Sequence, residues 1–125
     1  MVQLLLDTHV FLWWRTDDRR VRGVARDAIS KADVVFVSVA SAWEVAIKSR
    51  LGRLTLLADF AAGIDESGFE RLSISFAHAD ETARLPDHHR DPFDRMLVSQ
   101  ARVERLTLTT HDRALEPYDV DKLWI

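Results

Sequence analysis

The strongest structural signal in the chain is the segment DPFDRMLVSQARVERLTLTTHD, residues 91–112. Asp91 stands before Pro92, which is the usual order of an N-cap and a first helical residue. Apolar side chains then recur at helical spacing, at Phe93, Met96, Leu97 and Ala101. This pattern predicts a helix over Pro92–Glu104. The apolar run Leu106–Thr109 follows directly and is typical of a buried strand.

The same alternation of strand and helix signals extends through the rest of the chain. Apolar runs predict strands at Gln3–Leu6 and Val34–Val37, with weaker candidates at Arg71–Ile74 and Lys122–Ile125. Helical patterns predict Val21–Lys31, Ala40–Leu51, Leu57–Gly68 and Phe76–Leu85. The apolar face of the helix over 40–51 is predicted to carry Trp43, Ala46, Ile47 and Leu51. Continuous apolar strands that alternate with helices favour a parallel sheet covered on both faces.

Length and composition place the chain among ordinary globular proteins. It has 125 residues, 47% hydrophobic and 30% charged, which predicts a single domain spanning residues 1–125. The absence of cysteine excludes disulfide scaffolds and cysteine-bound zinc. A net charge of −3 argues against a protein that holds nucleic acid mainly by its own net charge. No targeting signal is visible and no apolar run approaches the roughly 20 residues of a spanning helix, so a cytoplasmic protein without membrane contact is expected.

Two acids follow predicted strands directly. Asp7 comes after Gln3–Leu6, and Asp112 follows the strand over 106–109. Ligands of open α/β sheets bind outside the carboxyl ends of the strands, which is where both side chains are expected. Each is equally well explained as the N-cap of the next helix. Position alone leaves the two interpretations open.

Two further acids lie within predicted helices. Asp94 is expected on the side that carries Leu97, Val98 and Ala101, whereas Arg95, Ser99 and Arg102 are expected to face solvent. A carboxylate on an apolar face is costly to bury unless it is paired, although a contact with the helix N-terminus is the simpler alternative. Glu44 has its own simple alternative, a surface pair with Lys48 one turn later.

These four carboxylates come from separate segments and could meet at one edge of the sheet. Carboxylate oxygens are hard ligands that suit Mg²⁺ or Mn²⁺. Such a cluster is typical of metal-assisted hydrolysis of phosphodiester bonds, in which the ion activates water and stabilises the leaving oxygen. Spacing alone indicates this chemistry without establishing it.

Four short motifs, in order along nearly the whole chain, resemble a known family. They are LLLDTH at 4–9, SAWE at 41–44, DPFDRML at 91–97 and LTTHD at 108–112. The chain resembles PIN-domain ribonucleases, and most closely the VapC-type toxins of bacterial toxin–antitoxin modules. The resemblance implies a PIN-like three-layer α/β sandwich, with a central, mostly parallel sheet flanked by helices. It also implies an endoribonuclease that depends on Mg²⁺ or Mn²⁺.

Site residues are assigned by matching the family's motifs. The resemblance makes Asp7 and Asp94 the core metal ligands, while Glu44 is a further ligand or orients a water. Asp112 is the fourth catalytic acid, with the least constant role. Thr8 and Thr110 match supporting positions, and Asp91 is a fifth acid near the site. Whether Asp112 or Asp91 completes the site is left open.

Partners and alternatives complete the expectations. Toxins of this family usually form homodimers, are silenced by a cognate antitoxin, and cut structured RNA such as tRNA or rRNA to arrest translation. A receiver domain is a weaker alternative, because it needs paired acids after the first strand and Asp7 stands alone. A non-catalytic binding module of the same fold is a second alternative, which a metal-dependence assay separates. The five histidines are scattered without a ligand-like helical spacing, so no histidine-based metal site is predicted. His9 and His111 stand beside site acids, and they either assist RNA binding or, more simply, are solvated or packed.

Overall fold

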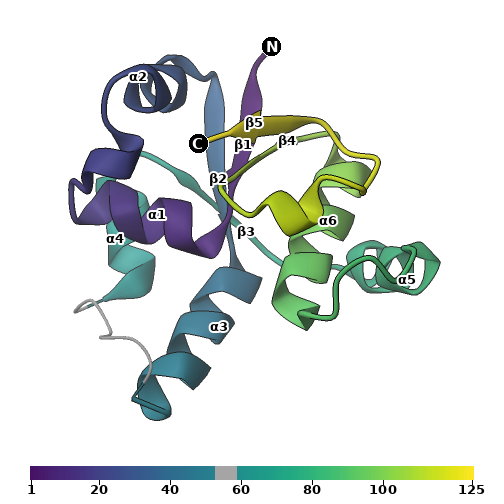
Figure 1. Cartoon of the computed structure of the whole chain (residues 1–125). Helices are drawn as coiled ribbons and strands as arrows, with labels where there is room; N and C mark the ends of the chain where they lie inside the picture. The colour runs from purple at the N-terminus through teal and green to yellow at the C-terminus, as the bar shows by residue number, and fades with distance from the viewer. Residues whose placement is uncertain (53–58) are drawn as a thin grey trace.

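A five-stranded parallel sheet organises the chain, with strand order β3-β2-β1-β4-β5 (Figure 1). The computed structural model describes residues 1–52 and 59–125. The strands are β1 Gln3–Leu6, β2 Val34–Ser38, β3 Glu70–Leu72, β4 Thr107–Thr110 and β5 Lys122–Trp124. The predicted α/β class with a central parallel sheet is confirmed. The central position of β1 places its carboxyl end in the middle of the sheet edge.

Helices cover both faces of this sheet, which makes three layers. They are α1 Thr8–Arg15, α2 Val24–Lys31, α3 Val39–Arg50, α4 Phe60–Glu66, α5 Phe76–Arg84 and α6 Pro92–Glu104. Figure 1 shows α1, α2 and α4 on one side, with α5 and α6 on the other. Side chains of β1 alternate between two apolar cores, because Leu4 and Leu6 join one cluster and Leu5 joins the other. The sheet is therefore buried on both faces, as its continuous apolar strands predict.

Strand register brings several chain segments to one edge of the sheet. Leu6 pairs with Val37 of β2 and with Thr109 of β4. The backbone N–H of Asp7 donates to the carbonyl of Thr109 at 2.9 Å. The carboxyl ends of β1, β2 and β4 are consequently level, and α1 and α3 begin at that edge.

Element bounds differ from the sequence predictions in a few places. Helix α1 was not predicted, because its apolar run after Asp7 resembles a strand as much as a helix. Helix α2 begins at Val24 rather than Val21, since Gly23 adopts φ 67° and a short 3₁₀ turn, Arg19–Val21, precedes it. The predicted helix over 57–68 is observed as Phe60–Glu66, and its predicted first residue, Leu57, lies outside the described residues.

Two helices turn a different face inward from the one predicted. Trp43 of α3 is 58% exposed and the C-cap of this helix, Leu51, is 59% exposed, whereas the buried side carries Ala40, Ser41, Glu44 and Val45. On α6, Ser99 is fully buried rather than exposed to solvent, and Arg95 is mostly covered. Both lie on the side of α6 near α5, where Arg95 donates to the Thr82 carbonyl at 2.9 Å. Within the described ranges, no helix is both long and apolar enough to cross a bilayer.

Candidate active site

Asp7 is both a helix cap and a buried acid at the centre of the sheet edge. Its Oδ1 accepts from the backbone N–H of Val10 at 2.9 Å, which caps α1. Its Oδ2 accepts from the Thr110 hydroxyl at 2.5 Å. Only 6% of Asp7 is exposed, and this burial raises the pKa of its carboxyl above the ordinary value. The interpretation as an N-cap is therefore confirmed, and the interpretation as a ligand-binding acid stays a prediction.

Thr110 links the first acid to the last. Its hydroxyl donates to Asp7 and accepts from the backbone N–H of Asp112 at 3.0 Å. Asp112 in turn caps the 3₁₀ turn Arg113–Leu115, with Oδ1 accepting from Ala114 N–H at 3.0 Å. One short segment, from the last residue of β4 to the 3₁₀ turn, thus orients both carboxyl groups.

Glu44 lies on the buried side of α3 and is only 3% exposed. Its Oε1 accepts from the Thr8 hydroxyl at 2.5 Å, and that hydroxyl also lies 2.9 Å from Ser41 Oγ. Its Oε2 lies 2.5 Å from Lys48 Nζ, and this hydrogen bond raises the pKa of Lys48. The pair predicted as a surface contact exists, but its acidic member is buried at the site.

Asp91 and Asp94 have separate environments at the start of α6. Asp91 Oδ1 accepts from the backbone N–H of Phe93 at 2.8 Å and of Asp94 at 3.2 Å, so it is the N-cap. Burial, together with the negative charges of Asp91, Glu44 and Asp7, raises the pKa of Asp94 to about 7. Acids from α6, α3 and the end of β1 thus lie close enough to repel one another.

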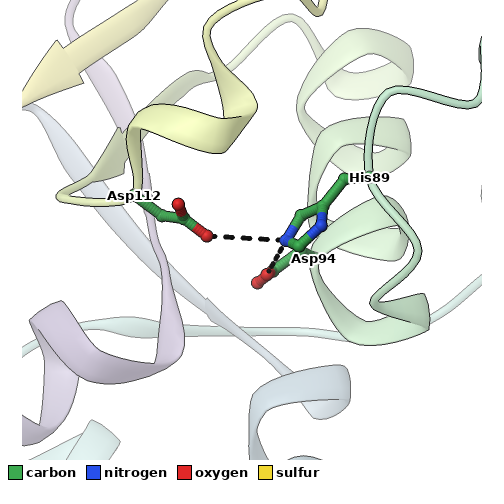
Figure 2. Close-up of side chains that lie close together, drawn as sticks. All are labelled: His89, Asp94 and Asp112. Carbon is green, nitrogen blue, oxygen red and sulfur yellow. Dashed lines mark hydrogen bonds and ion pairs between the residues drawn. The ribbon is translucent and has the colours of Figure 1, made fainter.

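His89 is a member of the site that the sequence did not reveal. Its Nε2 lies 2.9 Å from Asp94 Oδ2 and 3.5 Å from Asp112 Oδ2, so the imidazole stands between two carboxylates (Figure 2). No ligand-like spacing singles out His89 in the sequence. The only hint was its place just before the 91–97 motif, because the contact joins a loop, a helix and a second loop rather than one helical face.

The donor set fits a divalent cation. His89, Asp94 and Asp112 offer ligand atoms that all lie within 4.8 Å of one another. Asp94 is mostly buried and crowded by like charges, which a cation would relieve. Carboxylate oxygens are the ligands that Mg²⁺ and Mn²⁺ prefer. The structure brings Asp7, Glu44 and Asp94 into one electrostatic cluster, and it links Asp112 to that cluster through Thr110 and His89.

Comparisons with known proteins identify relatives of the chain. The family model of the PIN domain matches residues 4–121 of the chain. The chain is similar to Ribonuclease VapC22 of Mycobacterium tuberculosis (strain ATCC 25618 / H37Rv), at 28% identity over 94% of this chain and 93% of that protein.

Solved structures share the fold at lower identity. One is VapBC2 from Rickettsia felis bound to a DNA fragment from its promoter, with TM-score 0.74, 13% identity and 98% of each chain covered. Another is a toxin–antitoxin complex from Klebsiella pneumoniae, with TM-score 0.64, 19% identity and 91% of each chain covered.

Proposed function

The chain belongs to the PIN domain family, and from that membership we propose that it is an endoribonuclease of the VapC type that depends on Mg²⁺ or Mn²⁺. The similarity to Ribonuclease VapC22 over nearly the whole length of both chains supports this activity. The shared fold with chains of toxin–antitoxin complexes supports the role of toxin in such a pair.

The observation that carries the proposal is the crowding of acids around Asp94. Its pKa of about 7 reflects burial and three neighbouring carboxylates that come from separate segments. A divalent cation is the natural counter-charge for such a cluster. Asp7 and Asp94 are the proposed core ligands, with Glu44 and Asp112 completing the acidic set. When bound, the cation would lower the pKa of water and stabilise the charge that develops on the leaving oxygen.

The surrounding residues hold these acids in fixed orientations. Thr110 donates to Asp7, Thr8 donates to Glu44, and Lys48 pairs with the second oxygen of Glu44. These contacts restrain the carboxylates of Asp7 and Glu44 before any ligand arrives, which lowers the cost of reorganisation on binding. Thr8 and Thr110 accordingly keep the supporting role that the resemblance gave them.

A cluster of aromatic and basic side chains supports RNA as the substrate. Its members include residues that are next to the acids in the sequence. The ring of Trp13 lies 5.5 Å from that of His111 and 6.1 Å from that of His9, and the Arg20 guanidinium lies 4.7 Å from the Trp13 ring centre. Single-stranded bases in loops stack on such side chains, and arginines contact phosphates. The proposed substrate is a structured RNA with an exposed loop, such as tRNA or rRNA.

Exposed apolar side chains support protein partners. Val39, Trp43 and Ile47 leave an apolar stripe on α3, with Trp43 58% exposed, and Phe76 on α5 is 92% exposed. Apolar groups gathered at a surface mark protein interfaces. The proposed partners are a second copy of the chain and a cognate antitoxin. An arginine of that antitoxin placed among the acids would relieve their repulsion and block the site.

Cleavage of a loop-containing RNA by the purified chain tests the activity. EDTA should abolish cleavage, Mn²⁺ should restore it, and the products should carry 5′-phosphate and 3′-hydroxyl ends. Asp7→Asn should lower the rate at least about a hundredfold, whereas Asp80→Asn, at an exposed acid on α5, should not. Undiminished cleavage in EDTA, or 2′,3′-cyclic phosphate ends, would refute metal-dependent hydrolysis. Absence of any cleavage together with absence of metal binding would favour a non-catalytic module.

A further inference from the structure

His89 lies where a ligand of the proposed cation would lie. It stands in the loop between α5 and α6, and its side chain is 24% exposed. Figure 2 shows its imidazole between the carboxylates of Asp94, on α6, and Asp112, after β4. An ordinary surface salt bridge joins one cationic side chain to one carboxylate. Here one ring nitrogen faces two acids from different elements at 2.9 and 3.5 Å.

The backbone of this loop is held independently of the acids. The His89 N–H donates to the Tyr118 hydroxyl at 2.9 Å, and Tyr118 is only 2% exposed. Arg95 donates to the same hydroxyl at 3.1 Å, to the Pro86 carbonyl at 3.0 Å and to the Thr82 carbonyl at 2.9 Å. The ring of His88 packs against Tyr118 with centroids 5.2 Å apart. The position of the imidazole is therefore set by the fold of this loop, and not only by attraction to the carboxylates.

The spacing of the donor atoms suits a single ion. Adjacent ligands of an octahedral cation with bonds of about 2.1 Å are separated by about 3 Å. The separations from His89 Nε2 to Asp94 Oδ2 and Asp112 Oδ2, 2.9 and 3.5 Å, are close to that value. All three atoms lie within 4.8 Å of one another. No rearrangement of the backbone is needed for the three groups to face one cation.

We propose that His89 supplies a nitrogen ligand to the divalent cation of this site, alongside Asp94 and Asp112, and thereby favours Mn²⁺ over Mg²⁺. Imidazole suits transition metals, whereas Mg²⁺ prefers oxygen ligands and water. An all-carboxylate site would not discriminate in this way. The inference rests on the proposed function, because it requires a cation among the acids.

Pulsed electron paramagnetic resonance of Mn²⁺ bound to the full chain tests the inference without using activity. The wild type should show modulation from a coordinated ¹⁴N nucleus. Labelling the histidines with ¹⁵N should remove this modulation and give that of ¹⁵N instead. His89→Gln should lose the signal, whereas His88→Gln should keep it. Equilibrium dialysis should show that His89→Gln weakens Mn²⁺ binding about tenfold or more, with a much smaller change for Mg²⁺.

The outcomes separate this inference from the nuclease proposal. Mn²⁺ binding without nitrogen modulation, or with modulation that persists in His89→Gln, overturns the role of His89 and leaves the nuclease proposal standing. Equal weakening of Mn²⁺ and Mg²⁺ binding makes His89 a positioning residue and also overturns the ligand role. Failure of the wild type to bind either ion overturns both proposals. If His89→Gln does not fold, as judged by near-ultraviolet circular dichroism, the nitrogen signal is followed in His→Gln variants of the other four histidines. Survival of the signal in all four assigns it to His89, and its loss in one of them overturns the assignment.

Discussion

Asp91 accepts a hydrogen bond from the backbone N–H of Asp94 at 3.2 Å, so one acid of the 91–97 motif caps the turn that carries the other. The same proximity lets the charge of Asp91 raise the pKa of Asp94. The two carboxyl groups are three residues apart, yet one is used by the helix terminus and the other faces His89 and the acidic cluster. This division of roles can be tested directly.

Substitution should separate stability from metal binding at this pair. Asp91→Ala removes the N-cap and should lower the free energy of unfolding by about 0.5–2 kcal/mol, while the rise in Tm on adding Mn²⁺ persists. Asp94→Ala should abolish that Mn²⁺-induced rise. Asp91→Asn is the control, because asparagine caps as well as aspartate. The assignment is reversed if Asp91→Ala loses the Mn²⁺ effect and Asp94→Ala keeps it.

The pH dependence of stability should report Asp94 in metal-free protein. Its folded pKa of about 7 lies above the ordinary value of 3.8, so its neutral form favours folding at low pH. That contribution is complete below about pH 4 and is lost as the pH rises to about 7. Asp94→Asn should therefore have a free energy of unfolding higher than that of wild type at pH 8, by on the order of 2–4 kcal/mol, and the two should match near pH 4.

Thermal melts across pH 4–8, in EDTA, measure this difference. Asp87→Asn is a suitable control because the Asp87 side chain is fully exposed. Saturating Mn²⁺ should reverse the order of wild type and Asp94→Asn at pH 8. A constant difference between the two proteins from pH 4 to pH 8 would show that Asp94 titrates normally.

Thr110 should matter for metal binding through Asp7. Thr110→Val keeps the shape but removes the hydroxyl that donates to the Asp7 carboxylate, so the pKa of Asp7 should rise further and protons should compete better with metal. Isothermal titration at pH 6 should show weaker Mn²⁺ binding, with the loss diminishing at pH 8. Thr109→Val is the matched control, since that buried hydroxyl has no hydrogen-bond partner among the described residues. Equal effects of both variants would exclude a specific role.

Lys48 should stabilise Glu44 most when metal is absent. Lys48→Met leaves a buried carboxylate without its counter-charge and should lower the free energy of unfolding by about 1–3 kcal/mol in EDTA. Adding Glu44→Gln to this variant should recover most of the loss, because no buried charge then remains. Urea unfolding of the wild type, the two single variants and the double variant gives the coupling energy between Lys48 and Glu44. Additive effects of the two substitutions would mean that the pair contributes nothing.

Local periodicity accounts for the parts of the fold that the sequence predicted. Helix α6 has the predicted bounds, Pro92–Glu104, because proline, its preceding cap and the apolar spacing all agree. The strands β1 and β2 were found within one residue, since runs buried on both faces need no partner to be recognised. The resemblance to the PIN family is confirmed by the family match over residues 4–121.

What escaped prediction depends on contacts between distant segments. Trp43 and Ile47 are apolar, which predicts burial, but the side of α3 that meets the sheet edge carries Ser41 and Glu44 instead. No pattern within one helix reveals that exchange, because it depends on the hydrogen bonds that Ser41 and Glu44 make with Thr8 of α1. His89 was missed for the same reason, since its two carboxylate neighbours lie 5 and 23 positions later in the chain. The assignments of Asp7, Glu44, Asp94 and Asp112 to catalysis remain predictions.

The hydrogen bond between Thr110 and Asp7 joins residues 103 positions apart. During synthesis the first acid leaves the ribosome long before β4, the strand that completes its surroundings, has been made. A nascent chain that ends before residue 110 therefore has an unsupported Asp7, and neither the loop after β4 nor Asp112 exists yet. The acidic cluster therefore cannot be assembled until translation has passed residue 112, because Thr110 and Asp112 are the last of its members to be made.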